Sequence, residues 1–327
     1  MGTNPSILDV AKAAGVSAAT VSHVINSTKQ VSEKTRETVL KAIKDLGYKP
    51  NMAARTFKTG KTKLIAFVVP DIANSFFATL IEEIETVLAS KGFKLMILNT
   101  KETKSREIDN INAVACGMVD GFLIASTMED YKELEGVLPE DIPAVFIDRR
   151  LPHCSRDTIT VNCYEAVERG IEYLIGRGHK KIGYITGLSR ISTTTERLNA
   201  YENAMKAHGL YDKSLIKVGD SMSHCVDSHL SALLENGCTA ICIANNVMAT
   251  EAMMLMSQKG ILPGRDVELM GFKDSDIAQY GLQHMSLVCQ PTKEMGKLAG
   301  HQILELIESP SRPTSSIILN AVFQERK

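Results

Sequence analysis

The sequence predicts a chain of two parts: an all-α helix-turn-helix head with a hinge, then an α/β core of two Rossmann-like parallel-sheet subdomains. The first 50 residues contain helix-length segments and no strand pattern, whereas from Leu64 onwards apolar runs of strand length alternate with amphipathic segments of helix length. The charge divides at the same place. Residues 1–63 hold 11 Lys and Arg against four Asp and Glu, and the rest holds 26 against 34. A basic module therefore precedes a mildly acidic body.

Length and composition limit the class of protein. The 327 residues, 44% of them hydrophobic, suffice for two or three folded units. Seven scattered cysteines without a Cys-x-x-Cys pair argue against a disulfide framework or a zinc site and favour a reducing compartment. The N-terminus lacks the apolar core of a signal peptide, and no apolar stretch reaches the ~18–20 residues that cross a bilayer. We expect a cytoplasmic protein with no membrane partner, no metal and no cofactor.

Capping residues mark the helices of the head. Asp9 lies three residues after Ser6 and completes a capping box with it. The predicted helices run from Ser6 to Gly15, from Ser17 through Ile25, and from Ser32 to Gly47. A short helical candidate, Asn51–Lys58, follows Pro50 and precedes a polar linker. These patterns divide the chain into a head (1–50), a hinge helix with linker (51–63) and a core (64–327).

The core follows the alternation of strands and helices that is typical of parallel βαβ units. Strands are predicted at Leu64–Val69, Lys94–Leu98, Gly121–Ala125, Ala144–Ile147, Ile182–Thr186, Ala240–Ala244 and Val267–Met270. Helices are predicted near Phe77–Lys91, Lys104–Gly117, Tyr131–Leu138, Tyr164–Arg177, Glu196–His208, His224–Glu235 and Ala249–Lys259. Open sheets of this kind bind ligands beyond the carboxyl ends of their strands. We therefore expect site residues just after Val69, Ile147, Thr186, Ala244 and Gly271. No Gly-x-Gly-x-x-Gly or phosphate-loop pattern follows a strand, which argues against a nucleotide-using enzyme.

The head has the pattern of a DNA-reading module. A helix, a glycine turn and a second helix on a basic segment give the geometry that lays the second helix in a major groove. Hydroxyls there bond phosphates or bases, alanine methyls contact thymine methyls, and an imidazole can donate to a guanine edge. The candidate DNA contacts of this helix are Ser17, Ala18, Ala19, Thr20, Ser22 and His23. A small three-helix packing module with a polar surface is the alternative, and the local pattern does not decide between them.

Motifs along the whole chain resemble the lac/galactose/purine repressor family. They are Asp9–Asn26, Gly47–Phe57, Val69–Phe77, Val119–Gly121, Phe146–Arg149, Gly178–Gly183, Gly271–Phe272 and Val288–Pro291. They stand in the order that the family has. The resemblance implies a transcription repressor that is not an enzyme and whose affinity for DNA is controlled by a small effector. It also implies a homodimer whose two heads read a pseudo-palindromic operator.

The hinge segment takes its expected role from the same resemblance. Its helix would contact DNA through Asn51, Ala54, Arg55, Phe57 and Lys58. Arg55 and Lys58 would bind phosphates. Phe57 stands where relatives have a leucine that wedges into the minor groove, a contact that offsets a few kcal/mol of base unstacking. The alternative is that Phe57 packs one hinge helix against the other.

For the core, the resemblance implies a binding-protein-like fold. Two halves are joined by three crossings, including ones near residues 160 and 290, and the effector lies in the cleft between them. The expected ligand-binding residues are Asn74, Phe76, Phe77, Asp148, Arg149, Arg197, Asn245 and Lys273. Aromatic rings suit the apolar face of a sugar or base, and the guanidinium of Arg197 suits hydroxyls, carboxylates or phosphates. As alternatives, Phe76 and Phe77 belong to the core, and Arg197 is a solvated helix residue.

Three positions depart from the family pattern and bear on the ligand. Lys273 replaces a carboxylate in Gly271–Asp274, Asn246 replaces another, and Cys163 follows Asn162 where relatives have Asp-Asn. Fewer acids and one more cation favour an anionic effector, such as a sugar acid or sugar phosphate, paired with Lys273 and Arg197. The alternative is that Lys273 pairs with a neighbouring acid and the pocket takes an uncharged ligand.

Two other classes of protein remain as rivals. A solute-binding sensor without DNA function shares the core fold but has no use for a basic helix-turn-helix head. An enzyme built on Asp148, His179 and Ser189 lacks a Gly-x-Ser-x-Gly nucleophile turn. Both rivals explain less of the sequence than a ligand-controlled repressor does.

Overall fold

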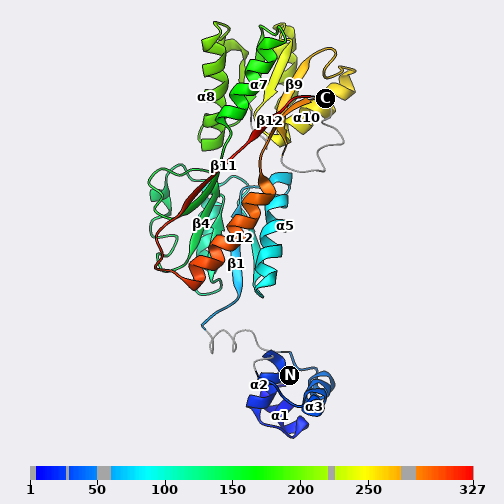
Figure 1. The fold of residues 1–327 in the computed structure, drawn as a ribbon, viewed down its shortest axis with the longest axis vertical. Helices are drawn as coiled ribbons and strands as arrows, with labels where there is room; N and C mark the ends of the chain where they lie inside the picture. The colour runs from blue at the N-terminus through cyan, green and yellow to red at the C-terminus, as the bar shows by residue number, and fades with distance from the viewer. Residues whose placement is uncertain (1–4, 27–28, 50–59, 220–224, 274–284, 327) are drawn as a thin grey trace. The chain divides into compact units, whose positions relative to one another are not determined.

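The computed structural model describes residues 5–26, 29–49, 60–219, 225–273 and 285–326. The chain forms two compact units, Met1–Thr62 and Lys63–Lys327 (Figure 1). The second unit holds two parallel sheets with helices on both faces of each. The predicted fold class is confirmed, with an all-α head and an α/β core of two subdomains.

The head consists of α1 (Ile7–Ala14), α2 (Ala18–Asn26) and α3 (Glu33–Leu46) around a small apolar core. The predicted capping box is present. The backbone N–H of Asp9 donates to Ser6 Oγ over 3.3 Å, and the Ser6 N–H donates to Asp9 Oδ2 over 2.8 Å. Gly15 ends α1 at φ 65°, in the left-handed region where glycine pays no steric penalty. Local sequence signals thus define the boundaries of the helices that bear the candidate DNA surface.

The first subdomain is built on the six-stranded sheet β11-β5-β4-β3-β1-β2. Its strands are β1 (Leu64–Val69), β2 (Lys94–Asn99), β3 (Gly121–Ile124), β4 (Ala144–Asp148), β5 (Asp157–Asn162) and β11 (Ser316–Asn320). Alternate residues of each strand face opposite sides. One face packs on α5 (Ser75–Ser90) and α12 (Thr292–Glu308), which lie side by side in Figure 1, and the other packs on α6 (Lys104–Val114).

The second subdomain repeats this order as β12-β10-β9-β8-β6-β7. Its strands are β6 (Ile182–Thr186), β7 (Ile216–Val218), β8 (Ala240–Ile243), β9 (Glu268–Lys273), β10 (Met285–Cys289) and β12 (Val322–Gln324). Its helices are α7 (Tyr164–Gly176), α8 (Ser192–Ala207), α9 (Val226–Glu235) and α10 (Asn246–Lys259). All pairs in the two sheets are parallel except β10 with β12.

The chain passes between the subdomains three times. It leaves the first sheet after β5, returns between β10 and α12, and passes once more at Ala321 between β11 and β12. Figure 1 shows β11 and β12 as one dark red run that enters both subdomains. Each subdomain is therefore completed by a segment that follows the other in sequence.

Several predicted elements differ from the structure. The expected helix Tyr131–Leu138 is wrong, since only a 3₁₀ turn, η1 (Tyr131–Leu134), forms there and Gly136 adopts φ 75°. The helix expected from Glu196 begins at Ser192. Strands β5, β7, β10, β11 and β12 and helix α12 were not predicted from the sequence. Among the described residues, none of the helices is both long and apolar enough to cross a membrane.

Candidate functional site

The amino end of α2 is the candidate DNA-reading surface. Ser17 precedes the helix, and its Oγ accepts the backbone N–H of Thr20 over 3.1 Å. The two hydroxyl oxygens lie 2.9 Å apart. Val21 and Val24 are buried in the head core, so α2 presents its opposite side outward. Of the predicted DNA contacts, Ser17 and Ala19 are exposed, Thr20, Ser22 and His23 are half-buried, and Ala18 is half-buried and packs against the head core.

The predicted hinge contacts lie outside the described residues. They are Asn51, Ala54, Arg55, Phe57 and Lys58. Their roles stay predictions.

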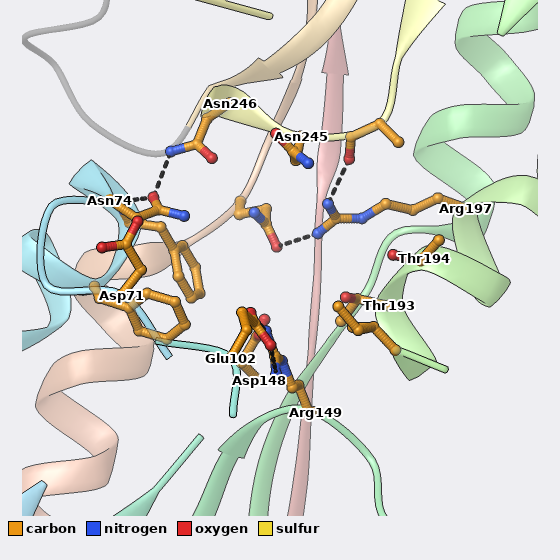
Figure 2. Close-up of a pocket in the computed structure, with 15 residues that line it drawn as sticks. Asp71, Asn74, Glu102, Asp148, Arg149, Thr193, Thr194, Arg197, Asn245 and Asn246 are labelled. Carbon is orange, nitrogen blue, oxygen red and sulfur yellow. Dashed lines mark hydrogen bonds and ion pairs between the residues drawn. The ribbon is translucent and has the colours of Figure 1, made fainter. Parts of the chain in front are cut away.

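A polar pocket lies between the two subdomains, where the carboxyl ends of strands from both sheets meet, as expected for open parallel sheets (Figure 2). Its volume is about 700 Å³ with the open space at its mouth included. Its lining consists of Asp71, Asn74, Phe76, Phe77, Glu102, Asp148, Arg149, Ile191, Thr193, Thr194, Arg197, Ala244, Asn245, Asn246 and Gln290. Seven of the eight predicted ligand-binding residues are in this lining. Lys273, the last residue of β9, is not.

Two asparagines connect the subdomains at this pocket. Asn74 caps α5, and its Oδ1 accepts the Phe76 N–H over 3.0 Å. The same oxygen accepts Asn246 Nδ2 over 2.6 Å, and that amide group also donates to Ser75 Oγ over 3.0 Å. Asn245 caps α10 by accepting the Met248 N–H over 2.9 Å. Helix caps of both subdomains thus supply amides to one cavity (Figure 2).

Arg197 is a fixed, buried cation of α8. One terminal nitrogen donates to the Ala244 carbonyl over 2.7 Å, and the other donates to Gln290 Oε1 over 3.2 Å. Its guanidinium carbon lies 3.9 Å from the centroid of the Phe272 ring, a cation–π distance. The alternative of a solvated helix residue is wrong, because only 7% of Arg197 is exposed. Cys163 lies beside it, and burial raises the pKa of this thiol to about 11.

Asp148 is the last residue of β4 and Arg149 follows it, and both line the pocket. Asp148 has a φ of 69°, and both residues are buried. Burial raises the pKa of Asp148, against the nearby charges of Arg149 and Arg197, which lower it. The Arg149 guanidinium donates to Glu102 Oε2 and to the Ser126 carbonyl over 3.0 Å each, and its second nitrogen pairs with Glu102 Oε1.

Phe76 and Phe77 combine the two roles that the sequence left open. Both are buried in the core of the first subdomain, with rings that meet edge to face at 5.1 Å between centroids. Both also line the pocket. One face of the cavity is therefore apolar while the rest is polar.

Sequence reasoning missed several residues of the lining. They are Asp71, Glu102, Ile191, Thr193, Thr194, Ala244 and Gln290, whereas Asn246 was named as a cleft position but not as a ligand-binding residue. The strand-end rule applied to β2 would have pointed to the loop that contains Glu102, because β2 ends at the same edge as β1. Gln290 lies just after β10, a strand that the pattern did not reveal.

The rival catalytic triad is not assembled. Asp148 is at the carboxyl end of β4, whereas His179 precedes β6 at the opposite, amino edge of the second sheet. The His179 Nδ1 lies 2.9 Å from Thr239 Oγ1. A histidine held there cannot act on a group in the pocket.

Comparisons with known proteins agree along the whole chain. Residues 6–51 match the family model "Bacterial regulatory proteins, lacI family", and residues 171–327 match that of the periplasmic binding protein-like domain. The HTH-type transcriptional repressor PurR of Vibrio atlanticus is 33% identical over 93% of this chain and 92% of its own. The ribose operon repressor of Haemophilus influenzae is 30% identical over 95% and 94%.

Solved structures show the same fold. A complex of the transcriptional regulator CelR with cellobiose has a TM-score of 0.70 at 28% identity and covers 98% of this chain and 99% of its own. A lac repressor dimer bound to operator and the anti-inducer ONPF has a TM-score of 0.83 at 22% identity, with 99% of each chain covered.

A helix-turn-helix head joined to a two-lobed core with an interlobe pocket defines a DNA-binding transcriptional repressor. The chain belongs to the lacI family of bacterial regulatory proteins. Its relatives are transcription regulators over nearly their full length, which confirms the prediction that the protein is not an enzyme.

Proposed function

We propose that this repressor binds a pseudo-palindromic operator as a homodimer and that a small, neutral, hydroxyl-rich molecule in the interlobe pocket controls its affinity for DNA. The observation that carries the proposal is the pocket itself. Amides, hydroxyls, carboxylates and guanidinium groups converge there on one cavity with an apolar aromatic face. That combination suits a sugar ring, whose faces are apolar and whose rim is polar.

The charge of the described lining supports a neutral rather than an anionic ligand. The sequence favoured an anion because acids are missing at three family positions and Lys273 adds a cation. In the described lining, however, three carboxylates, those of Asp71, Glu102 and Asp148, accompany the guanidinium groups of Arg149 and Arg197. Lys273 lies outside this lining. An anion in this pocket would therefore compete with carboxylates of the protein for the two guanidinium groups, so we propose a neutral ligand in place of the anionic one.

Two relatives support a sugar. One is named for the ribose operon, and the other is solved with cellobiose. We extend this ligand class to the present chain because Arg197, Asn245 and Asn246 offer a fixed set of donors and acceptors at the pocket wall. Binding would favour one arrangement of the two lobes and so shift the population that holds DNA.

For the DNA side, we propose that α2 enters the major groove and that the hinge enters the minor groove. The basic head supplies the non-specific attraction, and the exposed first turn of α2 supplies base contacts. Phe57 is the proposed minor-groove wedge. Arg55 and Lys58 are proposed to bind phosphates, and Asn51 and Ala54 are the other proposed DNA contacts of the hinge. We also place the protein in the cytoplasm, where its DNA is.

The testing experiment has two arms on the full chain. In the first, D-ribose and cellobiose are titrated during thermal unfolding, and a neutral sugar at ~100 times its dissociation constant stabilises the folded state by about 2.7 kcal/mol. Arg197→Met removes a fixed pocket donor and should abolish the shift, whereas the exposed Arg265→Met should keep it. A shift with anionic sugars alone would overturn the neutral ligand.

The second arm selects bound duplexes from a random DNA pool. We expect an enriched pseudo-palindromic site, and we expect the sugar found in the first arm to change its occupancy. Phe57→Ala should weaken binding to that site while leaving the melting of the core unchanged. Enrichment of a single asymmetric half-site would contradict the dimer.

A further inference from the structure

One cation of the pocket is already neutralised by the protein. The two terminal nitrogens of Arg149 meet the two carboxylate oxygens of Glu102 in a bidentate pair. A further bond from Arg149 goes to the Ser126 carbonyl over 3.0 Å. Both side chains are largely buried, with 9% and 15% of their surfaces exposed. Bidentate arginine–carboxylate pairs are among the strongest polar contacts in proteins, and low exposure weakens their screening.

The backbone is strained where it presents Glu102. Lys101 and Glu102 adopt φ values of 49° and 54°, in the left-handed region, which costs a non-glycine residue about 1–2 kcal/mol. The Glu102 N–H donates to the Pro70 carbonyl over 3.2 Å, which ties the loop to the end of β1. From the other subdomain, Arg190 donates to the Glu102 carbonyl over 3.3 Å. Strain of this kind persists where the surroundings hold a residue in place.

The buried carboxylate of Glu107 fixes the loop that accepts a hydrogen bond from Arg149. Glu107 accepts the Ser126 hydroxyl over 2.5 Å and the Thr127 hydroxyl over 2.6 Å. These bonds fix the loop whose carbonyl groups accept Arg149 and, over 3.4 Å, Arg190. The Glu102–Arg149 pair is thus held from three segments of the chain and is placed before any ligand arrives.

We propose that Glu102 is a specificity-determining residue: as an internal counter-ion of Arg149, it makes the pocket refuse anionic ligands and accept neutral ones. An incoming carboxylate or phosphate has to displace Glu102 from Arg149 and then lies near Asp71 and Asp148 as well. A neutral hydroxyl can bond to the pair without breaking it. The inference rests on the proposed function, because it concerns the ligand class of the same pocket.

The test changes the charge of Glu102 and measures anion binding to the full chain by calorimetry. The probes are inorganic phosphate and D-ribose 5-phosphate. Glu102→Gln keeps the shape of the side chain and removes its charge, so we expect about tenfold tighter binding of both probes than in the parent chain, a difference of about 1.4 kcal/mol. Adding Arg149→Met to Glu102→Gln should remove the gain.

Glu305→Gln is the matched control. It removes one negative charge from an exposed carboxylate that lies 3.9 Å from Arg312 and is not in the pocket lining. Unchanged anion affinity in Glu102→Gln, or an equal gain in Glu305→Gln, would overturn the proposal. If Glu102→Gln does not fold, Glu102→Asp draws the carboxylate back by one methylene, and a smaller gain in the same direction is expected, with no gain counting against the proposal.

Neutral sugars keep this test separate from the proposed function. Binding of D-ribose or cellobiose to the parent chain reports on the proposed function alone. A gain of phosphate binding in Glu102→Gln supports the counter-ion role even where neither sugar binds. Sugar binding without any gain supports the proposed function and removes the role of Glu102.

Discussion

The two subdomains share a strand order but contribute different chemistry to the pocket. In the described lining, the first supplies the three carboxylates and Arg149, whereas the second supplies Arg197 together with amides and hydroxyls. The cation of the first is paired with a carboxylate of its own subdomain, while Arg197 bonds to a backbone carbonyl and a glutamine amide. The repeated topology sets where site residues lie, and the loops after the strands set what they do.

Among the pocket residues compared, Arg197 should produce the largest loss of stability when it is replaced. We expect Arg197→Met to lower the free energy of unfolding by about 3 kcal/mol, because a buried carbonyl and a half-buried amide oxygen lose a charged donor. Urea denaturation of the full chain measures it. Arg265→Met, which removes an exposed arginine paired with its neighbour Asp266, should cost less than about 0.5 kcal/mol. Equal losses of unfolding free energy in the two variants would show that the buried contacts of Arg197 do not stabilise the second subdomain.

Asp148, on the first subdomain's side of the pocket, should make the stability of the protein depend on pH. Burial raises the pKa of its carboxyl in the folded protein above the unfolded value of about 3.9. At pH values well below about 3.9 it is protonated in both states and contributes no difference. As the pH rises towards the folded pKa, ionisation favours the unfolded state and the protein loses stability.

Asp148→Asn removes this loss. The variant should therefore gain stability over the parent chain above about pH 4, with a gap that widens until the folded pKa is passed. Asparagine also tolerates the φ of 69°, and that contribution is independent of pH. Melting temperatures from pH 4 to 8 test this. A gap that is constant with pH would rule out burial of the charge as its cause.

The smallest expected loss of stability comes from the hydrogen bonds of Asn246, which join the two subdomains. Asn246→Ala removes the donors to Asn74 Oδ1 and Ser75 Oγ, and we expect a loss of about 1 kcal/mol. Asn236→Ala, whose exposed amide donates to a carbonyl within its own helix end, is the control. Hydrogen exchange at the amino end of α5 should accelerate in the first variant alone. Equal exchange in both would mean that the asparagine pair does not hold the lobes together.

Much of the fold follows from local signals in the sequence. Ser6 with Asp9 and the glycines at 15 and 47 define helix ends by their own chemistry, and the strands from Leu64 to Asp148 are apolar runs. Strands β11 and β12 alternate exposed and half-buried residues and are short, so they form only through pairing with distant strands. Local periodicity does not show such partners.

The location of the pocket could be predicted from the sequence, because ligands bind beyond the carboxyl ends of parallel strands. Asn74, Asp148 and Asn245 lie on segments after apolar runs, and the family resemblance named them as ligand-binding residues. The partnership of Glu102 with Arg149 joins two loops 47 residues apart, and no spacing in the sequence encodes it. The anionic ligand was predicted from Lys273 without the acid of the β2 loop, and the charge of the ligand stays a proposal.

The pairing of β5 with β11 has a consequence for synthesis on the ribosome. Thr158 and Ser316 face each other across these strands, and their hydroxyl oxygens lie 2.7 Å apart. This edge strand of the first sheet is therefore made only after all of the second lobe except β12 has been translated. Until then, β5 of the nascent first lobe has an unpaired edge, and such an edge is a template for unwanted strand pairing. We expect holding by a chaperone, rather than folding lobe by lobe, to limit how fast this repressor appears in the cell.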